Sequence, residues 1–389
     1  MLDGTRVALG VTGSIAAVKA VELAHELRRH GATVRGVMTD SAQGIIHPWA
    51  VEFATDHPPV TELTGAVEHV DLCGRTGWAD VLLIAPATAN TVGKIAAAVD
   101  DTPVTTCATT ALGADVPVVI APAMHEPMYD HPGVLEAIDR VESWGVDFVD
   151  PRIEEGKAKL ASEAAIVTGV ARATTPATLD GRHVVVTSGA TTESIDPVRT
   201  LSNRASGRTG RAVARACYVR GASVTLVHDG PDVPYADVRS VESASEMLEA
   251  VQEAVAGDDG TAADALVSAA AIGDFTVETA AEKIRSGEHL TLDLKPTPKV
   301  LDSVRAEHPD LPMVGFKAET GGDGEAMAQR ARSLRNRVDL AFVVANDASV
   351  MGDDETRALL IRADAVETYT GSKAGLGARV ADELAAALD

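Results

Sequence analysis

The chain has 389 residues, of which 46% are hydrophobic, and it carries a formal net charge of −23. This length and hydrophobic content are sufficient for two domains, each with a core of its own. The acidic balance, without a visible basic patch, argues against nucleic-acid binding through phosphate neutralisation. No apolar run approaches the roughly 18 residues that a membrane-spanning helix requires.

The cysteines and the acidic residues describe the expected environment. Cys73, Cys107 and Cys217 are widely spaced and odd in number, which argues against a disulfide framework and against a zinc site. The N-terminus enters a strand pattern at once, without a signal-peptide layout, so we expect a soluble, cytoplasmic protein. Acidic side chains are spread along the chain. We hypothesise adaptation to a salt-rich cytoplasm, because at molar salt a Debye length of about 3 Å removes the self-repulsion.

The first half opens with a βαβ pattern. Residues 6–10 predict a buried strand, a glycine-containing loop then opens a helix that ends at His30, and residues 33–38 predict the next strand. A helix that starts after such a loop offers a phosphate site at its N-terminus. The loop is not GxGxxG, so a dinucleotide fingerprint is absent.

Two later apolar strands end in loops of small residues. Residues 81–84 lead into 85–90, and residues 116–120 lead into 121–125. Ligands in open α/β sheets bind beyond the carboxyl ends of strands, so we expect both loops to face one crevice. For either loop alone, the alternative is that proline and small residues only terminate the strand.

The second half repeats this layout after a linker. Residues 171–180 are small and polar and contain a proline, the composition of a domain boundary. Beyond them come a strand at 183–187, a loop, a helix that ends at Arg220 and a strand at 223–228. We therefore predict an α/β protein with two doubly wound, Rossmann-like three-layer domains, at residues 1–170 and 181–389.

A long polar loop joins the first strand of the second half to its helix. Residues 187–210 read TSGATTESIDPVRTLSNRASGRTG. Their glycines, hydroxyls and asparagine can present donors to an anion at the start of the following helix. An irregular loop of about twenty residues inside a compact domain is usually functional. The alternative is an ordinary surface loop of turn-forming residues.

This loop also carries a family resemblance. Residues 196–199, 201–203 and 206–210 resemble the signature of phosphopantothenate–cysteine ligase. That domain is often fused behind a flavin-dependent phosphopantothenoylcysteine decarboxylase in bifunctional coenzyme A biosynthesis proteins. The first half resembles this decarboxylase, and the resemblance, to an archaeal, halophile-type member, covers nearly the whole chain. It implies a flavodoxin-like flavoprotein domain followed by a nucleotide-binding ligase domain.

By this resemblance, the strand ends of the first half hold FMN. FMN would oxidise the cysteinyl group so that its carboxylate leaves as CO2, and would then return the electrons. His69 matches the active-site histidine of the family, and a histidine side chain exchanges protons near neutral pH; the alternative is a structural histidine. The FMN candidates are Gly13, Ser14, Thr39, Thr88 and Asn90.

Two positions depart from the family pattern. Many relatives have an asparagine that contacts the substrate carboxylate where this chain has His125, which can still donate a hydrogen bond. The relatives also carry a proton-donating cysteine in the segment that corresponds to residues 151–162, where this chain has none. Lys157 or Lys159 would donate instead, or would only bind phosphate. The alternative is an active ligase beside an impaired flavin half that serves as an assembly core.

The motifs of the second half imply a CTP site. Asn203 would hold an acyl-cytidylate, Lys283 would bind the triphosphate, and Mg2+ is expected with the nucleotide without a protein cage. Arg332 and Asn336 stand where the family often has two lysines, with Arg335 and Arg337 nearby. The nucleotide-binding candidates are Ala270, Asp274, Lys283, Thr297, Pro298, Lys299, Val300, Phe316, Arg332 and Asn336.

The resemblance implies two consecutive reactions. The carboxylate of 4′-phosphopantothenate attacks CTP, cysteine displaces CMP from the acyl-cytidylate, and decarboxylation gives 4′-phosphopantetheine. A homotrimer or a multiple of it is expected, because the relatives bind FMN between subunits. Two other classes compete: a binding or regulatory protein, disfavoured by His69 and the ligase motifs, and an NAD-dependent oxidoreductase, disfavoured by the missing GxGxxG.

Overall fold

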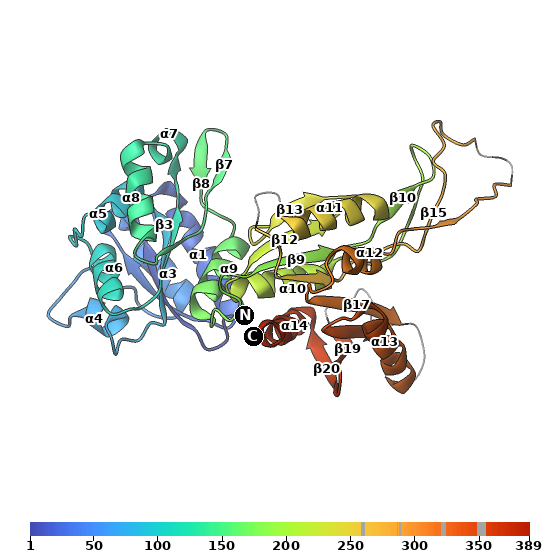
Figure 1. Ribbon diagram of the computed structural model, residues 1–389. Helices are drawn as coiled ribbons and strands as arrows, with labels where there is room; N and C mark the ends of the chain where they lie inside the picture. Colours follow the sequence, from blue (N-terminus) through green and yellow to red (C-terminus); the bar gives the residue numbers. More distant parts are fainter. Residues whose placement is uncertain (258–260, 286, 288, 320–323, 348–354) are drawn as a thin grey trace. The chain divides into compact units, whose positions relative to one another are not determined.

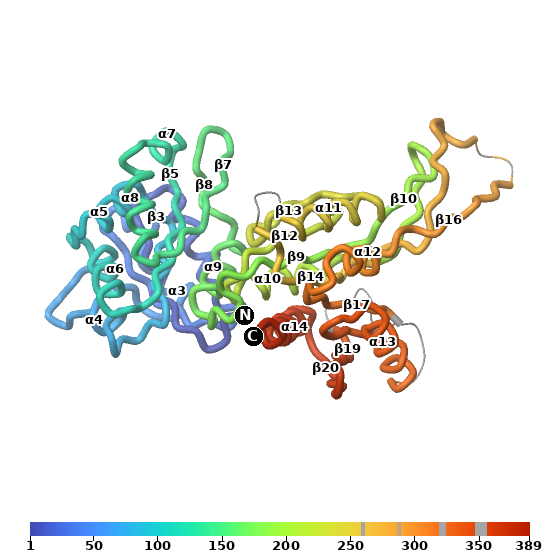
Figure 2. The backbone as a smooth tube through the Cα atoms, viewed as in Figure 1, coloured from blue at the N-terminus to red at the C-terminus, as the bar shows by residue number. Residues whose placement is uncertain are grey.

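The chain folds into two compact units, Met1–Pro176 and Ala177–Asp389. The computed structural model describes residues 1–257, 261–285, 287, 289–319, 324–347 and 355–389. Figure 1 shows the helices and strands of each unit, and Figure 2 traces the backbone from the blue N-terminus to the red C-terminus. Within the described residues, no helix is both long enough and apolar enough to cross a membrane.

Unit 1 is built on a parallel sheet of five strands in the order β2-β1-β3-β4-β6. The strands are nearly continuous apolar runs because helices cover both faces of the sheet. Val118 and Ile120 pack into a cluster with the helices of one face, while Val119, between them, faces Gly169 of the helix on the other. The strands are β1 (Arg6–Val11), β2 (Thr33–Met38), β3 (Val81–Ala87), β4 (Val118–Pro122) and β6 (Asp147–Phe148).

Helices η1, α2 and α5 begin shortly after the carboxyl ends of β1, β2 and β3. A small antiparallel sheet, β5-β8-β7, follows β4. The helices are η1 (Ile15–Lys19), α1 (Ala20–Arg29), α2 (Asp40–Gln43), α3 (Pro48–Thr55), α4 (Glu68–Cys73), α5 (Ala89–Ala96), α6 (Pro103–Gly113), α7 (Glu126–Tyr129), α8 (Pro132–Glu142) and α9 (Glu163–Thr174). The strands of the small sheet are β5 (Met124–His125), β7 (Arg152–Glu154) and β8 (Lys157–Lys159).

Helix α9 includes the first four residues of the segment predicted to be a linker. Ile166, Val167, Val170 and Ala171 form a buried face that continues past residue 170, so the helix ends only at Thr174. The irregular connection between the units is therefore shorter than the sequence indicates.

Unit 2 is built on a sheet of eight strands within the described residues, in the order β13-β12-β9-β14-β17-β18-β19-β20. The pairs from β13 to β18 are parallel, and β19 and β20 add an antiparallel pair at one edge. The strands are β9 (His183–Ser188), β12 (Ser223–His228), β13 (Asp237–Ser240), β14 (Ala265–Ser268), β17 (Met313–Glu319), β18 (Phe342–Asp347), β19 (Glu355–Ile361) and β20 (Val366–Ser372).

Two groups of helices cover the faces of this sheet. Val213 of α10 and Val380 of α14 share one apolar cluster, whereas Met247 of α11, Val304 of α12 and Ala331 of α13 share another. The prediction of three-layer α/β domains with parallel sheets is therefore confirmed. The helices are α10 (Arg208–Val219), α11 (Ala244–Ala256), α12 (Val300–Glu307), α13 (Gly324–Val338) and α14 (Lys373–Leu388).

The long loop after β9 contains a hairpin, β10 (Thr192–Ser194) and β11 (Thr200–Ser202), which the sequence did not predict. It lies beside the antiparallel pair β15 (Phe275–Thr276) and β16 (Lys295–Pro296), and together these segments form an arm that projects from the unit 2 sheet (Figure 1). The Thr276 hydroxyl donates to Glu193 Oε2 at 2.7 Å, and the Ala280 N–H donates to the Ile195 carbonyl at 2.9 Å. These bonds hold the two parts of the arm together.

A buried carboxylate fixes the turn of the arm. Asp196 is 1% exposed and accepts backbone N–H groups of Val198 and Arg199, each at 2.8 Å, and of Ile284 at 3.1 Å, together with the Arg199 guanidinium. Burial alone would raise the pKa of Asp196, but these backbone and guanidinium hydrogen bonds lower it to about 2. The ionised carboxylate therefore locks residues 196–199 to the second part of the arm.

Candidate active sites

Hydroxyl side chains start the helices at the carboxyl edge of the unit 1 sheet. Ser14 follows β1, Thr39 follows β2 and Thr88 follows β3, and each accepts a backbone N–H from the first turn of the helix that it caps. Ser14 Oγ also donates to the carbonyl of Ala123, just beyond β4, at 3.0 Å. Four strand ends therefore meet at one edge, where unpaired helix N–H groups favour an anion.

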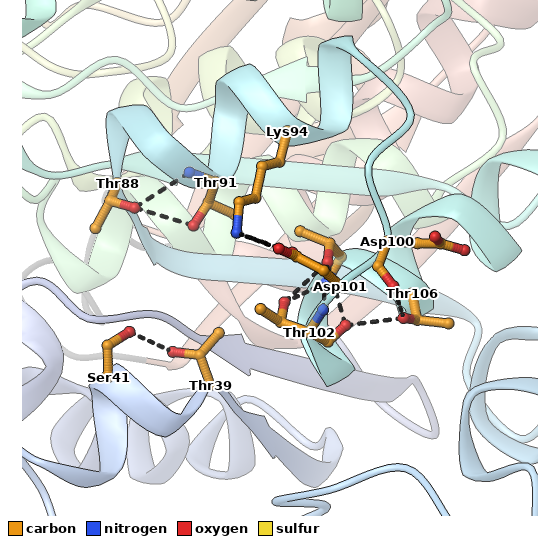
Figure 3. Close-up of polar contacts among 10 residues, drawn as sticks. Thr39, Ser41, Thr88, Thr91, Lys94, Asp100, Asp101, Thr102 and Thr106 are labelled. Carbon is orange, nitrogen blue, oxygen red and sulfur yellow. Dashed lines mark hydrogen bonds and ion pairs between the residues drawn. The ribbon is translucent and has the colours of Figure 1, made fainter.

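The loops at this edge are in close contact. Thr39 and Ser41 hydroxyls lie 3.0 Å apart, and Thr88 and Thr91 hydroxyls lie 2.9 Å apart (Figure 3). A Cβ at Gly13 would stand 2.3 Å from Ser41 Oγ, so no side chain fits at position 13. The groups left for a ligand are small hydroxyls and backbone donors, which suit the phosphate and the polyol of a flavin nucleotide.

The strand order places this edge at a topological switch point. The order reverses between β1 and β3, and in sheets of this order FMN binds at that point. Thr12 Oγ1 joins the two strand ends, because it donates to the Pro86 carbonyl at 2.8 Å and accepts the Thr88 N–H at 3.2 Å. Asn90 is exposed in the first turn of α5. The residues present therefore fit FMN.

An ion pair joins helix α5 to the segment just before α6 (Figure 3). Lys94 donates to both carboxylate oxygens of Asp101 at 2.8 Å. Asp101 directly precedes Thr102, whose side chain forms a capping box with Thr105 at the start of α6. This ion pair holds the segment between the two helices in place.

His69 lies in the first turn of α4 and is half-buried. Its Nδ1 is buried and has no hydrogen-bond partner within the described residues. Val67, which precedes the helix, has φ 53° and ψ 47°, a left-handed conformation that is unfavourable for a β-branched residue. Backbone strain of this kind clusters at functional sites, and the orphaned ring nitrogen leaves His69 able to bind another group.

The structure brings His125 and Lys157 together. They are direct register partners in the antiparallel pair β5–β8. Lys159 Nζ is held by Glu154 at 3.1 Å and by Glu155 at 2.9 Å, whereas Lys157 makes no side-chain hydrogen bond or ion pair with any described residue. The two lysines that the sequence left equivalent therefore differ in structure.

Unit 2 contains a cavity of about 540 Å3 at the carboxyl ends of its parallel strands. This volume is within the usual range of small-molecule sites. The cavity lies between the loop after β9, the loop after β14, the start of α12, the end of β17 and the last turns of α13. Its lining includes residues 203–210, 268–274, 297–302 and 316–318, with Leu334, Arg337, Asn346, Thr356 and Lys373.

Most of the predicted ligase residues line this cavity. They are Asn203, Ala270, Asp274, Thr297, Pro298, Lys299, Val300 and Phe316. Lys283, Arg332 and Asn336 are not among the lining residues. Lys283 lies on the arm next to Ile284, whose N–H bonds to Asp196, and the sequence alone could not show which face of α13 is turned to the cavity.

Buried threonines fix the loop that follows β14. Thr187 Oγ1 accepts the N–H groups of Ala269 and Ala270, both at 3.1 Å, and Thr191 Oγ1 accepts the N–H of Gly273 at 2.8 Å. Thr187 is fully buried, so these bonds are shielded from water. The backbone of the cavity wall is held before any ligand arrives.

Two polar side chains of the cavity already have partners. Asn203 Nδ2 donates to the carbonyl of Ala271 at 2.9 Å, and Lys299 Nζ donates to Asp274 Oδ1 at 2.5 Å. The Lys299 and Asp274 side chains are well exposed, so the ion pair can exchange partners with a ligand.

Within the described residues, no group of three or more His, Cys, Asp or Glu side chains is arranged to hold a metal ion.

Several basic residues of the cavity were not predicted as site residues. In a chain with a net charge of −23, they give the cavity the lining expected of a site for a polyanion. Arg204 and Arg208 belong to the long loop, and Lys317 follows Phe316 in β17, so their place at strand ends was a usable signal. The residues are Arg204, Arg208, Lys317, Arg337 and Lys373.

Family comparisons match the two units separately. The family described as "Flavoprotein" matches residues 1–175. The family described as "DNA/pantothenate metabolism flavoprotein C-terminal domain" matches residues 179–388. The first match agrees with a flavin edge in unit 1, and unit 1 is a flavoprotein domain.

Whole-length relatives combine both matches. A coenzyme A biosynthesis bifunctional protein CoaBC from Thermococcus kodakarensis is 47% identical over 388 residues, covering 98% of this chain and 95% of the relative. The protein of the same name from Methanocaldococcus jannaschii is 36% identical over 390 residues, covering 99% and 94%. Among solved structures, the FMN-dependent cysteine decarboxylase SpaF is 32% identical, covering 44% of this chain and 99% of that chain, with a TM-score of 0.39.

The two CoaBC proteins match nearly the whole length of the chain, through both units. The chain therefore belongs to the coenzyme A biosynthesis bifunctional proteins, which carry out the phosphopantothenoylcysteine synthetase and decarboxylase steps of coenzyme A biosynthesis.

Proposed function

We propose that the unit 2 cavity binds CTP together with Mg2+, and that the carboxylate of 4′-phosphopantothenate attacks the α-phosphate with release of pyrophosphate. The observation that supports this most strongly is the basic lining of a 540 Å3 cavity in a strongly acidic chain. The first turn of α10, which starts at Arg208 in the cavity wall, adds N–H groups and a favourable dipole for phosphates. Mg2+ usually needs few protein ligands when phosphates supply the others.

The remaining cavity residues take the other parts of the nucleotide and the acyl intermediate in this proposal. Ala270 and Asp274 contact the nucleotide, and Phe316 and the 297–300 turn take its nucleoside end. Asn203 exchanges its bond to Ala271 for the acyl-cytidylate, so that the amino group of cysteine can attack the activated carbonyl. Lys283, on the arm, stays a predicted triphosphate ligand.

In unit 1, Gly13, Ser14, Thr39, Thr88 and Asn90 hold FMN at the switch-point edge. FMN, when bound, supplies the two-electron chemistry that allows the carboxylate of phosphopantothenoylcysteine to leave. His69 moves a proton at the substrate. The buried Nδ1 of His69 has no partner among the described residues and so can still bind another group, which supports this assignment together with the strained backbone at Val67.

Lys157 takes the place of the family's proton-donating cysteine. His125, its register partner, binds the substrate carboxylate, and the Lys157 ammonium donates a proton to the product. Lys159 is the weaker candidate, since two glutamates hold its ammonium group. The competing function is a working ligase beside an impaired flavin half, which the absence of a cysteine in residues 151–162 favours.

The experiment is a coupled assay in molar KCl with 4′-phosphopantothenate, cysteine, CTP and Mg2+, followed by mass spectrometry. Phosphopantetheine with CMP, pyrophosphate and CO2 is the expected result. Accumulated phosphopantothenoylcysteine would instead establish the competing function. No pyrophosphate from CTP, with turnover when ATP replaces it, would overturn the assignment of CTP.

We also propose a homo-oligomer, a trimer or a multiple of it, that works in a salt-rich cytoplasm. Large apolar side chains on η1 and α3 support an interface: Ile15 is 79% exposed, Trp49 76% and Phe53 74%. Trp49 and Phe53 are four residues apart on α3 and so lie on one face of the helix, and exposed aromatic groups of this kind mark interaction surfaces. Sedimentation analysis of the holoenzyme in KCl tests this, and a monomer at micromolar concentration would contradict it.

A further inference from the structure

Helix α4, which carries His69, forms one piece with the segment that follows it. The Ala79 N–H donates to the Leu72 carbonyl at 2.8 Å. A Cβ at Gly77 would stand 2.7 Å from the same carbonyl oxygen, so the helix and the segment pack backbone against backbone. Residues 68–79 are therefore held together as a unit, and a contact at one end of this unit also fixes the other end.

The start of α4 needs support from elsewhere in the fold. Val67, just before the helix, has a left-handed backbone, and a strained residue of this kind persists only where the surrounding structure holds it. The local contact is the Thr64 N–H, which donates to Glu68 Oε2 at 2.9 Å in an exposed position. An exposed hydrogen bond contributes little, so the helix depends on an anchor on the sheet.

Arg35 of β2 provides a contact between the sheet and this unit. Its guanidinium carbon lies 4.4 Å from the centre of the Trp78 ring. Val37, two residues further along the strand, packs in the same apolar cluster as Leu72, so Arg35 points to the face of the sheet that α4 covers. The Trp78 N–H in turn donates to the carbonyl of Asp71 at 2.8 Å, so the ring contact is joined directly to the helix.

An arginine is a costly choice at this position. Its Nε is buried and has no hydrogen-bond partner within the described residues, although the chain has 57 acidic residues and only 34 lysines and arginines. Removing a charged group from water costs free energy that an aliphatic side chain would not cost. A cation over the face of an indole ring recovers part of that free energy. The contact with Trp78 is therefore the physical reason for a cation here.

We propose that Arg35 is a positioning residue for the decarboxylation step: through Trp78 it holds α4, and with it His69, in the position that proton transfer requires. This inference rests on the proposed role of His69. Arg35 lies in the middle of β2 and acts without touching the substrate, whereas the FMN candidates lie at the carboxyl ends of the strands. Displacing a proton-transfer group slows the chemical step more than it weakens substrate binding, so the loss should fall on kcat.

The test measures decarboxylation of added phosphopantothenoylcysteine by the full-length holoenzyme. Arg35→Met keeps the apolar stem and removes the charge. It lowers kcat about 3- to 30-fold, the range expected for losing a cation–π contact, and leaves KM within twofold. Arg35→Lys recovers part of the loss, because an ammonium group also binds an aromatic face. Trp78→Leu gives a similar loss, and the double variant loses no more than the larger of the two single losses.

The His69→Asn background separates positioning from a general effect on stability. Because Arg35 acts through His69, adding Arg35→Met to His69→Asn changes the residual rate by less than twofold. Arg140→Met is the matched control, since it removes the same charge from an exposed position on α8, and its kcat stays within twofold of wild type. Flavin content and pyrophosphate release from CTP show that both units of each variant are folded.

Three results would overturn the inference and leave His69 its proposed role: a kcat within twofold of wild type in Arg35→Met, a loss of the same size with and without His69, or a loss of flavin from Arg35→Met that accounts for its lower rate. A wild-type decarboxylation rate in His69→Asn would overturn the proposed role of His69 and this inference with it.

Discussion

The two units place their sites at the same kind of edge but line them with different chemistry. The unit 1 edge is made of hydroxyl helix caps and a glycine without room for a side chain, as at Ser14, Thr88 and Gly13. The unit 2 cavity is lined by exposed ion pairs and further basic groups. Groups fixed by backbone geometry suit a cofactor that stays bound, whereas exposed charges that exchange partners easily suit a substrate that is replaced at every turnover.

His69 gives the largest expected effect on this comparison. His69→Asn removes the proposed proton-transfer group from unit 1 and leaves unit 2 unchanged. We expect the rate of phosphopantothenoylcysteine decarboxylation to fall about 10²- to 10⁴-fold. The flavin content and the rate of pyrophosphate release from CTP in the same variant are the controls. A decarboxylation rate within threefold of wild type would remove His69 from the mechanism.

Gly13 tests whether the unit 1 edge depends on backbone fit. Gly13→Ala places a Cβ 2.3 Å from Ser41 Oγ and forces the start of α2 to move. Overpacking of this kind costs about 1–3 kcal/mol, so FMN affinity should fall roughly 5- to 140-fold if this cost falls on the cofactor-bound state. The ratio of flavin absorbance to protein in the purified chain measures it.

The control for this change is Gly93→Ala in α5, where an added Cβ meets no atom within 4 Å. This variant should keep its full flavin content. Equal flavin content in the two variants would mean that the close contact between the β1 and α2 loops does not form the cofactor site.

The arm of unit 2 gives a smaller, pH-dependent effect. The pKa of Asp196 is about 2 in the folded chain, below the value of about 3.9 for an unfolded chain. The ionised carboxylate therefore stabilises the fold above about pH 4, and this contribution is lost as the pH falls through 2. Asp196→Asn should lower the melting temperature at pH 7.

This difference between wild type and Asp196→Asn should shrink between about pH 4 and pH 2, where the wild-type carboxyl takes up its proton. Thermal melts across that range measure it. A difference that is constant with pH would show that the hydrogen-bond geometry of the turn matters and its charge does not.

The features that could be predicted from the sequence depend on local patterns. Apolar runs, glycine turns and polar strand exits predicted β1, β9, the loop that carries Ala270 and the strand that carries Phe316. Parallel strand ends converge, so the cavity followed from them. The hairpin β10–β11 is different, since its arm forms only with β15 and β16, which lie far along the chain.

Other features depend on register and helix rotation, which a single sequence does not show. The pairing of His125 with Lys157 depends on a cross-strand register. That Arg337 lines the cavity, whereas Arg332 does not, depends on which side of α13 packs on the sheet. The orphaned Nδ1 of His69 follows from tertiary burial. Each required the folded chain, although the residues themselves were visible in the sequence.

The smallest expected effect is that of salt concentration, which should change ligand binding at one site and not at the other. Raising KCl from about 0.1 M to 1 M shortens the Debye length from about 10 Å to about 3 Å and screens exposed charges. The Kd for CTP should rise severalfold, because exposed cations bind the phosphates in the proposed site. The flavin content should stay constant, because hydroxyl and backbone donors hold FMN in the proposed cofactor site. The same salt should raise the melting temperature by a few degrees, since it screens repulsion within a chain of net charge −23. Calorimetry, flavin absorbance and thermal melts on one preparation measure all three. A CTP affinity that does not change with salt would contradict the electrostatic difference between the two edges. A melting temperature that does not change with salt would contradict the proposed adaptation to a salt-rich cytoplasm.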